Sequence, residues 1–167
     1  MQHTTLARIT VAATLLLGAP IMSACGQSAE SLTEQAIEAG TGSDVDIEGD
    51  KVTVTDEDGT AVSIGEDVAL PSNWPSDVPT VDGTLFTVSV SETSGEASAM
   101  WKTAGDPAAM AGAYKSALEA AGYTITSETK TADLVIIGAE GNGKTISVMF
   151  SQAEGEAVVT LSVAKAS

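Results

Sequence analysis

The sequence has almost no histidine, cysteine or arginine. His3 is its only histidine, Cys25 its only cysteine, and no arginine follows Arg8. A chain cleaved just before Cys25 therefore keeps no imidazole for general-base catalysis and no guanidinium to bind phosphate. Ser-His-Asp and Cys-His hydrolysis are excluded, as are zinc sites built from histidine and several cysteines.

Positive charge is scarce as well. Seven Lys and Arg stand against 23 Asp and Glu, which gives a formal net charge of −16 at pH 7. Binding to nucleic acids or to anionic lipid head groups relies on basic side chains that pair with phosphate. The composition therefore excludes a nucleic-acid binder of the usual kind. It predicts an acidic surface that attracts cations and basic partners, and no motif predicts a cofactor.

The N-terminal segment has the pattern of a secretory signal peptide, predicted to span residues 1–24. A basic start at Arg8 is followed by an apolar run over 9–22, which is shorter than the roughly 20 residues that span a bilayer. Its end, Met22-Ser23-Ala24-Cys25, resembles the lipobox of bacterial lipoproteins. The resemblance implies cleavage between Ala24 and Cys25 and a diacylglyceryl group attached to the Cys25 sulfur.

An ordinary secretory signal with a soluble product, or an uncleaved anchor, is the alternative. Ordinary cleavage requires small residues one and three positions before the cut, whereas Met22 is large. A single cysteine in an exported chain also has no disulfide partner. We therefore predict lipidation at Cys25, a tether over 25–30, and a position on the extracytoplasmic face of the cell membrane, since two acyl chains hold a protein stably.

Residues 31–69 predict a short helix followed by three strands. Ser31 and Glu34 fit a capping box. From residue 44 the apolar residues alternate, and Gly49-Asp50 and Asp58-Gly59 are typical of tight turns between strands. We expect an appendage of one helix and a three-stranded meander, in which the meander packs on this helix or on the next domain.

Residues 70–83 are rich in proline and predict an extended strap or linker. Trp74 lies within this segment. Packing of Trp74 on the domain is favoured, with an exposed contact for a ligand or partner as the alternative, and Trp101 is a second candidate for such contact.

Residues 84–167 predict the main domain. Asp106-Pro107 is typical of a helix start and Gly122 of a helix end. Short strands are predicted around this helix at 84–91, 97–103, 123–129, 132–138, 144–151 and 157–164. The predicted fold class is α+β, an antiparallel sheet with one packed helix, preceded by the appendage.

A second resemblance covers this part of the chain. The strap Trp74-Pro75-Ser76-Asp77-Val78-Pro79, followed by a helix that ends in Ala121-Gly122-Tyr123, resembles small actinobacterial envelope lipoproteins of unassigned activity. This resemblance brings no catalytic residues with it.

Three motifs invite a functional interpretation. Residues 138–145 fit the phosphate-loop pattern, but Glu140 would place a negative charge in a phosphate cradle, so a hairpin is favoured. Ser127-Glu128-Thr129-Lys130 fits the Ser-x-x-Lys pattern but falls in a predicted strand. Asp56, Glu57 and Asp58 are weak candidates for calcium ligands, with solvated acidic turns as the alternative; no other metal site is predicted.

Three functions stay open. The first is a non-catalytic envelope module that binds a protein, a wall component or a small ligand. The second is a carrier of a lipid or other apolar ligand, because an alanine-rich helix could leave room for a cavity. The third is a glycan-active enzyme, which needs two carboxyl groups roughly 5–9 Å apart in a cleft.

Overall fold

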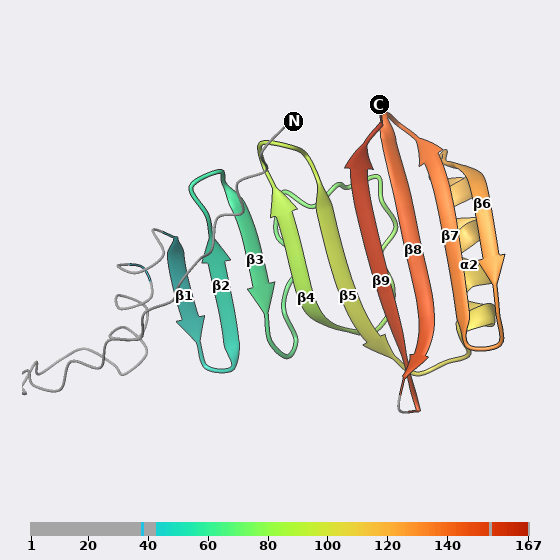
Figure 1. Cartoon of the computed structure of the whole chain (residues 1–167), viewed down its shortest axis with the longest axis horizontal. Helices are drawn as coiled ribbons and strands as arrows, with labels where there is room; N and C mark the ends of the chain where they lie inside the picture. Colours follow the sequence, from blue (N-terminus) through green and yellow to red (C-terminus); the bar gives the residue numbers. More distant parts are fainter. Residues whose placement is uncertain (1–37, 39–42, 154, 167) are drawn as a thin grey trace, which may run out of the picture.

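The computed structural model describes Glu38 and residues 43–153 and 155–166. The predicted signal peptide, the Cys25 anchor and most of the predicted helix at 31–40 lie outside these residues. The described part forms one nine-stranded antiparallel sheet with strand order β1-β2-β3-β4-β5-β9-β8-β7-β6 (Figure 1). Its strands are β1 Asp44–Glu48, β2 Lys51–Thr55, β3 Thr60–Ile64, β4 Thr84–Ser91, β5 Ala97–Thr103, β6 Thr124–Lys130, β7 Leu134–Gly141, β8 Lys144–Ala153 and β9 Glu156–Lys165.

The helix α2 (Pro107–Ala120) begins and ends where the sequence predicts. The Asp106 carboxylate accepts a hydrogen bond from the backbone N–H of Ala109 at 2.8 Å, which caps the first turn. At the other end the Tyr123 N–H donates to the Leu118 carbonyl at 3.0 Å, and Gly122 takes the left-handed conformation that this ending requires. Among the described residues, no helix combines the length and apolar character needed to cross a membrane.

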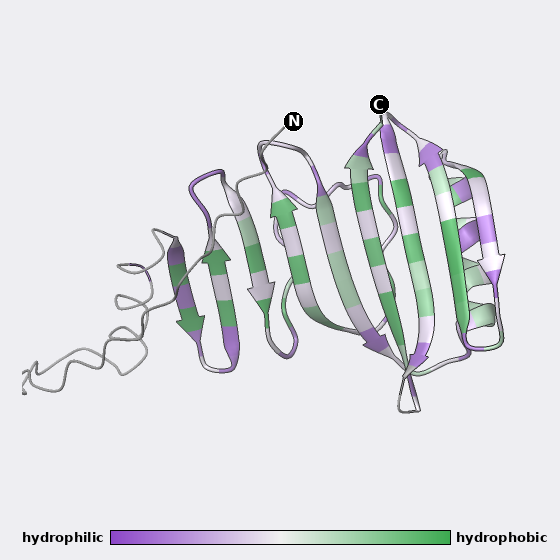
Figure 2. Ribbon diagram, in the orientation of Figure 1, coloured by the Kyte–Doolittle hydropathy of each residue, from purple (hydrophilic) through white to green (hydrophobic). Residues whose placement is uncertain are grey.

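One face of the sheet is covered and carries the hydrophobic core. Helix α2 packs on β6, β7 and β8 behind the sheet in the view of Figure 1. The connection between β3 and β4, residues 65–83, contributes Val68 and Val78 to the same core. Hydropathy therefore alternates along strands such as β4, β9 and β8 (Figure 2), as expected when only one face of these strands is buried. The largest fully buried side chains are Phe150, Leu118, Ile137, Ile146, Leu161, Val88, Val148 and Val159.

The apolar side of the sheet changes from one face to the other between β4 and β3. Val88 is buried on the covered face, and its neighbours Thr87 and Ser89 therefore point to the open face. Thr87 pairs with Ile64 and Ser89 with Val62, so the apolar residues of β3 lie on the open face. Ile64 is 55% exposed there.

The predicted fold class is wrong. The meander over 44–65 forms the three predicted strands, but it is not an appendage beside an α+β domain. Residues 60–64 of β3 pair with 87–91 of β4, so the meander continues the sheet and the chain is mostly strand with a single helix. Pairing along a strand edge uses backbone N–H and C=O groups and leaves little trace in the side-chain pattern.

The phosphate-loop pattern at 138–145 is a hairpin, as predicted. Asn142 and Gly143 connect β7 to β8 with φ values of 50° and 73°, which is typical of a two-residue turn between antiparallel strands. Ser127 and Lys130 likewise lie in strand β6.

Candidate functional site

A cleft of about 330 Å³ opens between α2, the β3–β4 connection and the sheet. Alanine side chains are short, so Ala113 and Ala117 leave space on the helix surface above Phe150 of β8. Residues of four elements line the cleft: Met110, Ala113, Tyr114 and Ala117 of α2; Phe150 of β8; Thr80, Val81 and Asp82 of the connection; and Thr103 and Ala104 at the end of β5. Its walls are therefore mainly apolar, with a few polar groups on one side.

Tyr114 holds the wall of this cleft in place. Its ring packs against Phe150 with centroids 5.8 Å apart and an interplanar angle of 63°. Its hydroxyl donates a hydrogen bond to the Pro79 carbonyl at 2.7 Å, which ties the connection to the helix. Burial raises the pKa of Tyr114 above its ordinary value, so the phenol stays protonated and keeps this bond. The cleft is thus bounded by fixed groups.

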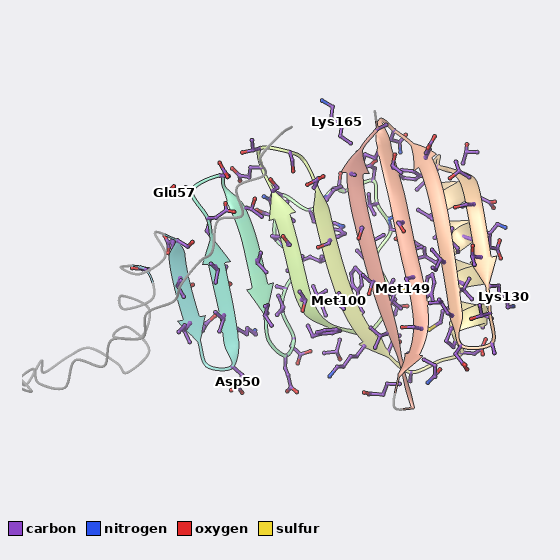
Figure 3. All side chains as sticks on the ribbon, in the orientation of Figure 1. Asp50, Glu57, Met100, Lys130, Met149 and Lys165 are labelled. Atoms are coloured by element: carbon purple, nitrogen blue, oxygen red, sulfur yellow. The ribbon has the colours of Figure 1, made fainter. Side chains whose placement is uncertain are left out.

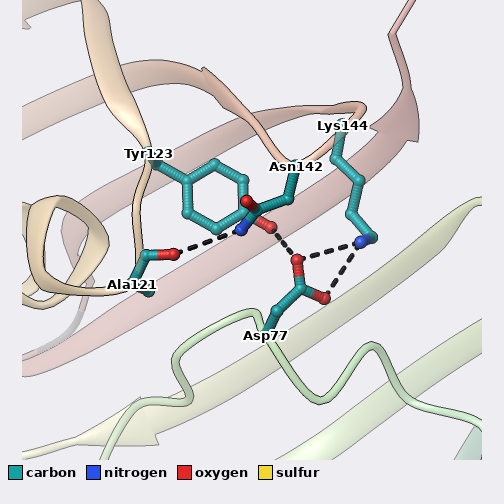
Figure 4. Close-up of polar contacts among 5 residues, drawn as sticks. All are labelled: Asp77, Ala121, Tyr123, Asn142 and Lys144. Atoms are coloured by element: carbon teal, nitrogen blue, oxygen red, sulfur yellow. Dashed lines mark hydrogen bonds and ion pairs between the residues drawn. The ribbon is translucent and has the colours of Figure 1, made fainter.

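A polar cluster fastens the connection at the C-terminal end of the helix (Figure 4). The Asp77 carboxylate accepts a hydrogen bond from the Tyr123 hydroxyl at 2.7 Å and from Lys144 Nζ at 2.9 Å to each oxygen. Asn142 donates to the Ala121 carbonyl at 3.1 Å. Three segments far apart in the sequence are joined here, so the cluster fixes the β3–β4 connection to the end of α2 and to the β7–β8 hairpin.

The pKa values of Asp77 and Tyr123 in this cluster are shifted in opposite directions. Burial disfavours the ionised form of Asp77, but the hydrogen bonds from Tyr123 and Lys144 outweigh it and lower the Asp77 pKa to about 2. For Tyr123, burial and the bond to Asp77 raise the pKa to about 12. Because the Asp77 pKa is lower than its ordinary value of 3.8, the ionised carboxylate stabilises the fold above that pH.

Replacing Asp77 with asparagine is expected to destabilise the protein in a pH-dependent way. The free energy of unfolding should be lower in Asp77→Asn than in the wild type at pH 7. The difference should shrink as the pH falls from 3.8 toward about 2, where the wild-type carboxylate becomes protonated. Urea unfolding of both proteins over this pH range measures it. A difference that stays constant down to the lowest pH would contradict the assigned role.

The two candidate tryptophans lie together in the core region. Trp101 of β5 is 2% exposed, and the half-buried Trp74 contacts its ring edge-on, with centroids 6.4 Å apart and an interplanar angle of 89°. Among the described residues, Trp74 Nε1 is a buried nitrogen without a hydrogen-bond partner. The pair packs the β3–β4 connection on the sheet. Contact of either ring with a partner stays a prediction.

The acidic cluster Asp56, Glu57 and Asp58 forms the turn between β2 and β3. Asp56 Oδ1 accepts hydrogen bonds from the N–H groups of Asp58 at 3.1 Å and Thr60 at 2.8 Å. One carboxylate is thus used to hold the turn. Within residues 43–153 and 155–166 and at Glu38, no three His, Cys, Asp or Glu side chains are grouped so that they could hold a metal ion.

The open face of the sheet carries a second hollow, of about 430 Å³. A row of serines crosses it, because Ser147 pairs with Ser162, Ser162 with Ser98, and Ser98 with Ser89. Met100 and Met149 lie toward the middle of the same face (Figure 3). The hollow is lined mainly by small hydroxyl side chains, with Glu96 as its only charged residue.

The residues of the apolar cleft were not singled out by the sequence. Met110, Ala113 and Ala117 recur at helical spacing, which predicts a face that packs on a sheet. The high alanine content of that face was the only signal that a cavity could remain. Val81 and Asp82 could not be assigned to the site, because nothing local shows where the β3–β4 connection crosses the helix.

Comparison with known proteins gives one partial similarity. Residues 84–156 match a family model described as START domain-like. The matching segment runs from β4 to the first residue of β9 and includes α2, Tyr114 and Phe150, but it covers less than half of the chain. No match to this chain is found among curated proteins or among solved structures.

Proposed function

We propose that this protein is a membrane-anchored carrier that binds a lipid or another apolar small molecule in the cleft beneath α2. The observation that carries the proposal is the cleft itself, which is bounded by Tyr114, Phe150 and the alanines of the helix. Apolar concave sites with a few polar groups are typical of small-molecule binding. The START domain-like match over 84–156 also favours a carrier of an apolar ligand over the other binding roles.

The size of the cleft limits the ligand. Small-molecule sites commonly measure roughly 300–1,000 Å³, and about 330 Å³ lies at the lower end of that range. A ligand with one acyl chain or one ring system fits this volume better than a phospholipid with two chains. The ligand is therefore proposed to be compact.

The proposed location follows from the sequence. Cleavage before Cys25 and diacylglyceryl attachment to its sulfur would hold the domain at the outer surface of the cell membrane. An anchored domain with an apolar cleft is suited to take up or release a ligand near the bilayer. An envelope protein or wall component is a second proposed partner, for which the hydroxyl-lined hollow on the open face offers a surface.

Binding without catalysis is part of the proposal. The walls of the cleft are mainly apolar and include one carboxylate, Asp82, whereas glycan hydrolysis requires two carboxyl groups that face each other across the sugar in one cleft. The hydroxyl of Tyr114 is engaged by the Pro79 carbonyl and the side chain is needed to shape the wall. A glycan-active enzyme is therefore not favoured.

Filling the cleft tests the proposal. Ala117→Phe places a ring among Tyr114, Phe150 and Met110, and should weaken binding of an apolar ligand by about 5- to 150-fold, since overfilling a packed site costs about 1–3 kcal/mol. The matched control is Ala120→Phe, which adds the same ring to an exposed position of α2 outside the cleft. Calorimetric titration with 1-decanol measures the dissociation constant of each protein.

The control should bind 1-decanol like the wild type. Circular dichroism and urea unfolding establish that both variants are folded. If neither the wild type nor the control binds 1-decanol or any acyl-chain compound of similar length, the carrier proposal is wrong. If Ala117→Phe binds as tightly as the control, the ligand occupies another part of the surface and the assigned cleft is wrong.

A further inference from the structure

The apolar cleft borders an acidic depression. Asp82, Thr103 and Ala104 line both the cleft and a neighbouring hollow at the end of the sheet. Four carboxylates line that second hollow, contributed by Glu66, Asp67, Asp82 and Glu156. The cleft and the depression therefore adjoin at these three residues, and we call this border the mouth of the cleft.

Little positive charge compensates these carboxylates. Lys102 is the single basic residue among those that line the depression, and its ammonium lies 5.5 Å from the centroid of the Phe86 ring. The ion pairs found in the described residues are Lys115–Glu128 and Lys144–Asp77, and neither involves the four carboxylates. The mouth of the cleft therefore carries a net negative charge that an incoming ligand would meet.

We infer that the ligand is a single-chain amphiphile with a cationic head, its chain in the cleft and its head in the acidic depression. This rests on the proposed function, because it requires that the cleft holds the apolar part. An ammonium group at the mouth would lie among Asp82, Glu156 and their neighbours. A sulfate or carboxylate head would be repelled by the same groups, and the overall acidity of the chain adds to this preference.

The carboxylates of the depression are not grouped as metal ligands. In the described part of the chain, no set of three acidic side chains is close enough to hold a metal. All four carboxylates are solvent-exposed, so each contributes a modest and salt-sensitive attraction. A cationic head that stays hydrated at the mouth matches this arrangement.

Three probes with the same ten-carbon chain test the inference: decyltrimethylammonium, 1-decanol and decyl sulfate, each titrated below its micelle-forming concentration. Decyltrimethylammonium should bind on the order of 10-fold more tightly than 1-decanol, and decyl sulfate more weakly than both. High salt should reduce the preference, because the Debye length falls from about 10 Å at 0.1 M to about 3 Å at 1 M.

Charge variants identify the groups responsible. Glu66→Gln and Glu156→Gln, which line the depression but not the cleft, should each weaken decyltrimethylammonium binding several-fold and leave 1-decanol binding unchanged. Lys102→Gln should have the opposite effect and strengthen the binding of decyltrimethylammonium. The matched control is Glu57→Gln, which removes an acidic group at the β2–β3 turn, at the end of the sheet away from α2 (Figure 3).

The outcomes separate this inference from the proposed function. If all three probes bind equally well and Ala117→Phe blocks all of them, the carrier function stands and the cationic head is wrong. If decyl sulfate binds most tightly, the inference is also wrong. If none of the probes binds, both proposals fail.

Discussion

Replacing Trp101 with alanine is expected to lower the free energy of unfolding by about 3–5 kcal/mol. The indole is 2% exposed on the covered face of β5 and packs against Trp74 of the β3–β4 connection. Both neighbouring strands are paired along β5, so the backbone cannot move in to close the resulting cavity. Because small domains are stable by only about 5–15 kcal/mol, much of the stability would be lost.

Urea unfolding followed by far-ultraviolet circular dichroism measures this loss, since the change itself removes one of the two tryptophan fluorophores. Trp74→Phe is the informative control. It keeps a ring against Trp101 but removes Nε1, a buried donor without a partner. Its unfolding free energy should stay within about 1 kcal/mol of the wild type, because no hydrogen bond is lost. If Trp101→Ala costs no more than the control, the two rings do not hold the connection on the sheet.

The elements set by local signals were predicted well. Asp106 and Gly122 define the two ends of α2, and both act through bonds within three to five residues along the chain. Asn142-Gly143 likewise sets its hairpin by backbone conformation alone. Such features depend on residues that are neighbours in the sequence, so a single chain is enough to identify them.

The joining of the meander to the main sheet was not predictable in the same way. The connection between Ile64 and Thr84 contains three prolines and has the composition of a linker. In addition, Val62 and Ile64 put their apolar side chains on the face opposite to Val88. A sheet whose apolar side changes from one face to the other between two strands has the sequence pattern of two separate units, although its backbone ladder is continuous.

The site depends on contacts between distant residues. Tyr123 and Asp77 are 46 positions apart and Lys144 and Asp77 are 67 apart, yet their bonds fix the connection that supplies Val81 and Asp82 to the cleft. The sequence favoured packing for Trp74 but could not place Trp101 beside it. Composition could suggest a cavity under an alanine-rich helix, but only the path of the connection shows where that cavity opens.

Replacing Cys25 with serine is expected to move the protein from the membrane fraction to the soluble fraction. The change removes the sulfur to which the diacylglyceryl group is predicted to be attached, and two acyl chains provide the stable part of membrane attachment. The acidic chain offers little electrostatic attraction to anionic lipids in their place. Fractionation of bacterial cells that process lipoproteins, with mass spectrometry of the intact protein, measures both attachment and modification.

Ser28→Ala is the matched control, because Ser28 follows the lipobox and its change leaves the cysteine in place. This variant should remain in the membrane fraction, with a mass that corresponds to the lipidated chain beginning at Cys25. A wild-type protein that begins at another residue, or that carries an unmodified Cys25, would contradict the anchor. The proposal for the cleft would be unaffected by that result, because it rests on residues of α2, β8 and the β3–β4 connection and not on the anchor.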